Sequence, residues 1–343
     1  MIETIKTLCE IKGTSGYEGF VCDYIKERVK NFADDIREDT MGNLFVFKKG
    51  KKSRKKPLMV CAHMDEVGLI IKGITDDGYL SFDFAGGVDK RVVIGKRVLI
   101  GEKEIPGIIG MKAVHLTTKD ERKKTPKLSE LCIDIGCEKK TAAEKLVSLG
   151  DFAVFDSPLR ELGENRIKAR AIDDRFGCGV MLKLIESELE YDTHFVFTVQ
   201  EEVGCRGAEI AAFAVEPAYA LVLEATTAAD IPGAEGDGKV CVLGKGAVIG
   251  CMDGGAIYDK KLFALLRKFA EDKGIGWQIK TRIAGATDAR SINVSKDGVR
   301  TTSLSLPTRY IHSPSCVADI RDMNAVLALA REFVNCEEEK LNA

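Results

Sequence analysis

Two histidines stand just beyond predicted strands, where their side chains can take part in metal binding. His63 and Asp65 follow the apolar strand at residues 58–62, and His312 lies in a loop after the strand predicted at residues 301–306. An imidazole nitrogen of His63 can bind a metal ion while Asp65 holds the other ring nitrogen. The same pattern is also common for a surface histidine beside acids, so a metal site needs support from other segments.

Carboxylates stand in pairs, or at the ends of apolar runs, at three further places. Asp173 and Asp174 lie between a predicted strand and a predicted helix, where an aspartate is also a favoured N-cap. Glu201 and Glu202 end an almost wholly apolar strand, and Glu224 ends another. Adjacent glutamates can lie just outside a sheet in water, but burying them is costly unless cations compensate their charge.

These segments follow consecutive elements of one predicted sheet. Open α/β sheets bind ligands at the carboxyl ends of their strands, so the side chains are expected to meet there. Imidazole nitrogens and carboxylate oxygens suit two zinc-like ions. A neighbouring carboxylate that binds no metal can act as a general base on water. The residues therefore indicate a two-metal site with hydrolytic chemistry.

The elements that must position these residues change character along the chain. From about residue 67 to 164, short β-branched runs alternate with glycine turns, which indicates a small β-rich domain. After residue 167, strands alternate with helices, which is typical of a mostly parallel sheet with helices on both faces. We expect residues 1–67 and 164–343 to form one α/β domain, with the β-rich residues 68–163 inserted into it.

Composition excludes several classes of partner. The 343 residues are 45% hydrophobic and 30% charged, and the net charge of −2 gives no general attraction to nucleic acid or an anionic membrane. The basic run 48–56 lacks interleaved aromatic residues, so we interpret it as a solvated loop.

No apolar run approaches the ~20 residues of a membrane helix, and the first residues show no secretory signal. Eleven cysteines, mostly within apolar runs, predict reduced thiols and a cytoplasmic protein.

At these residues the chain resembles the glutamyl and tetrahedral aminopeptidases, a family of dinuclear metallopeptidases. The resemblance extends from residues 14–18 (Thr-Ser-Gly-Tyr-Glu) and 42–43 to the segment 309–312, and its five motifs occur in the right order. It implies a phosphorylase/hydrolase-like, three-layer αβα catalytic domain with an inserted β-rich dimerisation domain. It also implies two divalent metal ions per subunit, zinc or alternatively cobalt, and the release of N-terminal residues from short peptides.

The resemblance also implies a role for each candidate residue. Asp173 resembles the carboxylate that bridges both ions, and the peptide bond from it to Asp174 is typically cis in the family. The other implied roles are His63 and Glu224 as ligands of one ion, Glu202 and His312 as ligands of the second, Glu201 as general base, and Asp65 as the orienting partner of His63. Residues 285–289, which include Asp288, match a motif near the substrate pocket.

Two positions depart from the family pattern. The family more often has Asp where Glu224 stands; the longer side chain keeps the carboxylate, so we expect ligation with altered geometry. The family often has Glu where Cys316 stands, four residues after His312, so this chain lacks a carboxylate there. The resemblance also implies homodimers built through the inserted domain, and many relatives form shells of twelve subunits.

Two other classes of function compete with a peptidase. Glycoside hydrolysis needs two carboxylates, and Glu201 with a distant acid can supply them, but that chemistry gives no reason for His63 and His312 at strand ends. A non-catalytic peptide-binding protein on this fold would not need every ligand type, and all of them are present. We therefore favour a metal-dependent aminopeptidase in which Glu201 moves a proton from water to the leaving amine.

Overall fold

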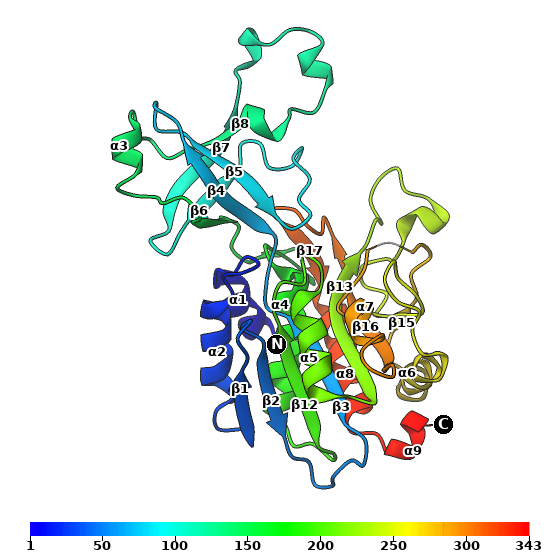
Figure 1. Cartoon of the computed structure of the whole chain (residues 1–343). Coiled ribbons are helices and arrows are strands. Elements are labelled where there is room, and N and C mark those ends of the chain that lie inside the picture. Colours follow the sequence, from blue (N-terminus) through cyan, green and yellow to red (C-terminus); the bar gives the residue numbers. More distant parts are fainter. Residues whose placement is uncertain (284, 343) are drawn as a thin grey trace.

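Strand pairing divides the chain into a large mixed sheet and a small closed barrel (Figure 1). The computed structural model describes residues 1–283 and 285–342. The path across the large sheet is β1 (Asp35–Glu38), β2 (Leu44–Lys48), β12 (Thr193–Thr198), β3 (Leu58–His63), β13 (Tyr219–Thr227), β16 (Arg300–Arg309), β17 (Cys316–Asp319), β11 (Arg166–Ala169) and β10 (Arg160–Leu162). Off this path, β14 (Ala247–Ile249) pairs with β16 and with β15 (Trp277–Gln278).

The centre of the large sheet is parallel. β12, β3, β13 and β16 run in the same direction, whereas β2 and β17 join them antiparallel on either side. All six residues of β3 are buried, and so are most residues of its neighbours. A parallel strand that is covered on both faces needs apolar side chains on both, which explains the continuous apolar runs in the sequence.

Helices cover both faces of this sheet. Along β3, Val60 and Ala62 pack in one core cluster, whereas Met59 and Cys61 pack in a second one, because successive strand residues point to opposite faces. The first face carries α1 (Ile2–Glu10), α2 (Gly19–Val29), α4 (Ile172–Ile185), α6 (Lys260–Lys273), α8 (Ile320–Val334) and α9 (Glu338–Asn342), and the second carries α5 (Arg206–Val215) and α7 (Ala289–Ile292). The predicted three-layer αβα architecture is confirmed.

The barrel lies at one end of the molecule (Figure 1). In order around it are β4 (Gly68–Ile74), β5 (Leu80–Ala85), β8 (Leu131–Asp134), β7 (Ile105–Met111), β6 (Arg97–Ile100) and β9 (Phe152–Phe155). Its interior is filled by its own apolar cluster, which includes Leu69, Phe82 and Ile133. The segments between these strands hold the short helices η1 (Val114–Leu116), η2 (Glu121–Lys123), η3 (Leu128–Glu130) and α3 (Lys140–Ala143), and η4 (Gly236–Lys239) lies in the α/β part.

The division into residues 1–67 with 164–343 and residues 68–163 stays a prediction. The last barrel strand ends at Phe155, and β10, at residues 160–162, already pairs with β11 in the large sheet. None of the helices in the described part of the chain is long and apolar enough to cross a membrane.

Candidate metal centre

The carboxyl ends of the parallel strands bring the predicted site residues together. His63 is the last residue of β3 and pairs with Thr198, the last residue of β12, so Glu201 and Glu202 follow at the same edge. The pairing of β13 with β3 places Val222 beside Cys61. Two residues further on, Glu224 therefore reaches the level of His63, since alternate residues share a face.

Asp173 enters from the segment between β11 and the regular part of α4. Its backbone and that of Asp174 are not helical, and the peptide bond between them is cis, as the resemblance implies. The next residue, Arg175, is fully buried. Its Nε donates to the carbonyl of Met64 at 2.8 Å, and its Nη1 donates to the carbonyl of Ile11 at 2.7 Å. This arginine therefore ties the start of α4 to the segment that follows His63.

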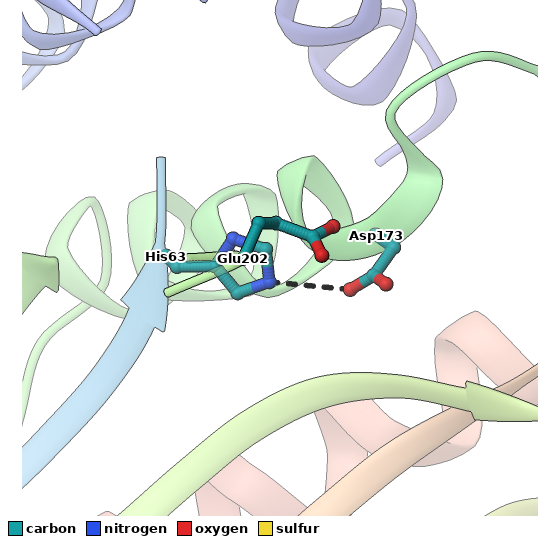
Figure 2. A group of neighbouring side chains, drawn as sticks. All are labelled: His63, Asp173 and Glu202. Carbon is teal, nitrogen blue, oxygen red and sulfur yellow. Dashed lines mark hydrogen bonds and ion pairs between the residues drawn. The ribbon is translucent and has the colours of Figure 1, made fainter. Parts of the chain in front are cut away.

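The two carboxylate oxygens of Asp173 face two different histidines. Oδ1 lies 3.2 Å from His63 Nε2 (Figure 2), and Oδ2 lies 3.3 Å from His312 Nε2. His63 Nε2 is also 3.4 Å from Glu224 Oε1, and His312 Nε2 is 3.3 Å from Glu202 Oε2. In a tetrahedral zinc site with ligand atoms about 2.0–2.1 Å from the ion, two ligand atoms lie about 3.3 Å apart. The four distances match this spacing.

The charges of this cluster are unbalanced. Glu224 and Asp173 are 5% and 7% exposed, and Glu202 Oε1 has no hydrogen-bond partner among the described residues. Burial raises the pKa of Glu202 and of Glu224 well above the ordinary value. Buried like charges of this kind are costly unless cations compensate them. With imidazole and carboxylate donors at the spacing just given, the residues present fit two divalent cations.

The two histidines respond to the same acidic surroundings. Burial by itself would lower the pKa of His63, but Glu224, Asp173 and Asp65 raise it well above the ordinary value. Burial also opposes protonation of His312, yet its contact with Asp173 and the charge of Glu202 raise its pKa to about 9. The acidic side chains of the cluster therefore favour positive charge at His63 and at His312. These are the two positions beside which a cation would bind.

Glu201 stands beside this cluster but makes different contacts. Its Oε1 accepts from the thiol of Cys205 at 3.3 Å, and Glu201, Cys205 and Asp288 form a close group. Burial raises the pKa of Glu201 to about 8 against the opposing charge of His63, and Asp288 adds to the increase. The sequence did not single out Cys205, because a cysteine at the start of a helix carries no signal of its own.

Asp65 has more partners than the sequence suggested. Its Oδ1 lies 3.3 Å from His63 Nδ1, but its own backbone oxygen is closer to that nitrogen, at 3.0 Å. Its carboxylate also accepts from Ser15 Oγ at 2.6 Å and from the backbone N–H groups of Glu201 and Glu202 at 3.0 and 3.1 Å. Asp65 thus contacts both the histidine and the backbone that carries the two glutamates.

The remaining predicted positions also lie at or near this centre. Asp288 is 1% exposed; its Oδ2 accepts from Thr198 Oγ1 at 2.5 Å, and its Oδ1 has no partner among the described residues. Cys316 lines a small cavity together with His312 and Asp173, and its thiol donates to the carbonyl of Tyr310 at 3.6 Å. The residue that replaces the family's glutamate is therefore buried beside the cluster without contributing a carboxylate.

Comparison with known proteins identifies similar sequences and structures. The sequence model of the M42 glutamyl aminopeptidase family matches residues 42–329. The lysyl aminopeptidase of Pyrococcus furiosus is 32% identical over 97% of this chain and 96% of its own length. Among solved structures, an aminopeptidase from the archaeon Desulfurococcus kamchatkensis superposes with a TM-score of 0.94 at 39% identity, covering 99% of this chain and 96% of that one. The TET1 peptidase of Pyrococcus horikoshii, which can assemble into a tetrahedron or a large octahedral shell, superposes with a TM-score of 0.86 at 36% identity over 97% and 98% of the two chains.

Proposed function

The chain belongs to the M42 glutamyl aminopeptidase family and is an aminopeptidase, and from this premise we propose that it acts through two divalent metal ions on the N-termini of short peptides. The observation that carries the proposal is the position of Asp173, whose two oxygens face different histidines. Each histidine has a second carboxylate beside it, Glu224 or Glu202. We assign His63, Glu224 and Asp173 to one ion, and His312, Glu202 and Asp173 to the other. The ions are zinc, with cobalt as the alternative.

The protein side chains divide the work of peptide hydrolysis among them. When bound, the ions supply Lewis-acid activation of water and of the scissile carbonyl. Glu201 accepts the proton of the attacking water and passes it to the leaving amine. Asp65 orients His63 through its ring Nδ1, which fixes the ring nitrogen that faces Asp173.

Removal of metal tests this assignment directly. We expect about two ions per purified chain and loss of hydrolysis of aminoacyl chromogenic amides after dialysis against a chelator, because both ligand sets need a cation. Added zinc or cobalt should restore the activity. A panel of different aminoacyl amides then reports the preferred N-terminal residue.

Two controls separate this function from its alternatives. An amide whose α-amine is acetylated should be a poor substrate, because an aminopeptidase acts on a free N-terminus. A chromogenic β-glucan should not be cleaved. Full activity without bound metal, or cleavage of the glucan that survives chelation, would contradict the proposal.

We further propose that the chain assembles into homodimers through the barrel, and that dimers form a shell of twelve subunits. The assembly of the related TET1 peptidase supports this proposal. Apolar side chains that are exposed on the barrel and on its long connection also support it, among them Ile108, Val114 and Leu116, which are 52%, 67% and 62% exposed.

Light scattering at micromolar concentration should show a dimer or a larger assembly. Val114→Asp should shift that assembly toward monomer, whereas Val294→Asp, at a similarly exposed site in the α/β part, serves as the control. A monomer from the unmodified chain would rule the assembly out.

A further inference from the structure

The turn that carries the two catalytic-centre glutamates is held by side chains from distant parts of the chain. This turn, residues 199–202, directly follows β12. Its four consecutive backbone N–H groups all donate to side-chain oxygens. The bonds are Val199 N to Asn43 Oδ1 at 3.1 Å, Gln200 N to Glu18 Oε1 at 3.1 Å, Glu201 N to Asp65 Oδ1 at 3.0 Å and Glu202 N to Asp65 Oδ2 at 3.1 Å.

The backbone of the turn needs such support. Gln200 has a φ of +56°, in the left-handed region that residues other than glycine rarely adopt. Such a conformation persists only where the surroundings determine it strongly. The chain reverses locally here, since Gly204 N and Cys205 N both donate to the carbonyl of Glu201 at 2.8 and 2.9 Å. The side-chain acceptors therefore hold a conformation that the sequence of the turn does not favour.

The three acceptor residues, Glu18, Asn43 and Asp65, are themselves buried and anchored, and we refer to them as the acceptor cradle. Glu18 is 6% exposed, and its Oε1 also accepts from Gly16 N at 2.8 Å. Asn43 is fully buried, and its Nδ2 donates to Asp39 Oδ2 at 2.7 Å. Because each acceptor side chain is buried and held by a further hydrogen bond, the acceptor cradle fixes the position of the turn backbone.

We propose that Glu18 and Asn43 are positioning residues for the reaction: through the backbone of residues 199–202, they set where Glu201 and Glu202 point. This inference rests on the proposed function of those two glutamates. Adjacent side chains leave the backbone in different directions, so a rotation of the turn would misplace the general base and a ligand together. A misplacement of about 1 Å can cost roughly 10²-fold in rate. The proposal also explains what residues 14–18 and 42–43 do, far from the metal cluster in sequence.

Two substitutions of Glu18 separate its acceptor from its charge. Glu18→Gln keeps Oε1 as an acceptor for Gln200 N and removes the charge, whereas Glu18→Asp keeps the charge and withdraws the acceptor by one methylene. We expect kcat within about 3-fold of the unmodified protein for Glu18→Gln, and a fall of roughly 10- to 100-fold for Glu18→Asp. KM should change much less than kcat, because Glu18 binds the backbone of the turn and is proposed to act through the positions of the two glutamates.

Backbone hydrogen exchange supplies a readout that does not depend on catalysis. In a peptide covering residues 196–206, exchange should become faster in Glu18→Asp and remain unchanged in Glu18→Gln. Asp322→Ala is the matched control, because its buried carboxylate likewise accepts two backbone N–H groups, from Gly244 and Gly246, each at 2.7 Å. It should speed exchange around those glycines and leave kcat and residues 196–206 unaffected.

Each result decides the proposal. Unchanged kcat and unchanged exchange in Glu18→Asp would overturn it. Equal losses in both Glu18 variants would overturn it as well, because Glu18→Gln keeps the acceptor and its loss would then not come from the hydrogen bond to Gln200 N. If the unmodified chain hydrolyses no peptide, the proposed function fails, but the exchange experiment still tests whether Glu18 holds the turn. Should Glu18→Asp not fold, Asn43→Ala is compared in the same way, with faster exchange at residues 196–206 expected.

Discussion

Glu201→Gln is expected to lower turnover by about 10²- to 10⁴-fold while metal content stays near normal. The amide keeps the shape of the side chain but cannot accept the water proton. Glu201 accepts from the thiol of Cys205, whereas Glu202 lies 3.3 Å from His312 Nε2, so we assign Glu202 as the ligand and Glu201 as the base. KM should change less than turnover, because the group acts mainly in the transition state. Metal analysis and aminopeptidase kinetics on the same purified sample measure both quantities.

Glu216→Gln is a suitable control for this experiment. Glu216 undergoes the same chemical change but lies at the exposed end of α5, where it pairs with Lys296. Both its metal content and its turnover should match those of the unmodified protein. Loss of one ion in Glu201→Gln with intact metal in Glu202→Gln would show that the two roles are reversed. Near-normal turnover in both variants would remove the mechanism.

Asp173→Ala is expected to lose both metal ions and to reduce hydrolysis to the background of the assay. The two carboxylate oxygens of Asp173 face His63 and His312, at 3.2 and 3.3 Å. Its removal takes a ligand from each proposed site at once. Glu224→Ala removes a carboxylate beside His63 alone, so it should weaken mainly one site and leave about one ion per chain. Metal content after gel filtration, followed by titration with added zinc, measures the two effects.

The Asp322→Ala variant controls for the loss of a buried carboxylate as such. Asp322 is fully buried on α8 and binds two backbone N–H groups rather than imidazoles. Its removal should lower thermal stability without lowering metal content. If Asp173→Ala kept two ions and full activity, or if Glu224→Ala lost both ions as readily as Asp173→Ala, a bridging role for Asp173 would be wrong.

Elements whose hydrophobic pattern lies within a single segment could be predicted from the sequence. Apolar runs that end in His63, Glu201 or Glu224 predict buried strands with polar groups at their carboxyl ends, and the structure has strands ending at or near these residues. The turn-dense pattern of residues 68–163 predicts a β-rich part, and the strands of the barrel lie within this range, between residues 68 and 155. In both cases the signal is the hydrophobic period of a single segment, which does not depend on its neighbours.

Features that depend on how two segments pack against each other could not be predicted from the sequence. β10 lies within the predicted range of the insert and pairs with β11 in the large sheet, a pairing that the sequence does not reveal. The imidazole Nδ1 of His63 faces the backbone oxygen of Asp65 as well as its carboxylate, which the spacing of the two residues does not reveal. Strand pairing and side-chain direction depend on packing between segments, and no periodicity records them.

By itself, the sequence determined the order of layers, the β-rich part and the set of side chains that the sheet edge brings together, because each follows from local hydrophobic patterning or from residue type. Only the tertiary structure decided how the glutamates are held. Glu18 meets Gln200 across 182 positions of sequence, Asn43 meets Val199 across 156, and Asp65 meets Glu201 across 136. Such pairings arise when packing of the whole core closes long loops, and an isolated segment has no means of choosing its partner. The same packing brings Asp173 to within 3.2 Å of His63 and 3.3 Å of His312, which belong to distant segments of the chain, and the proposed role of Asp173 as a shared metal ligand rests on this arrangement.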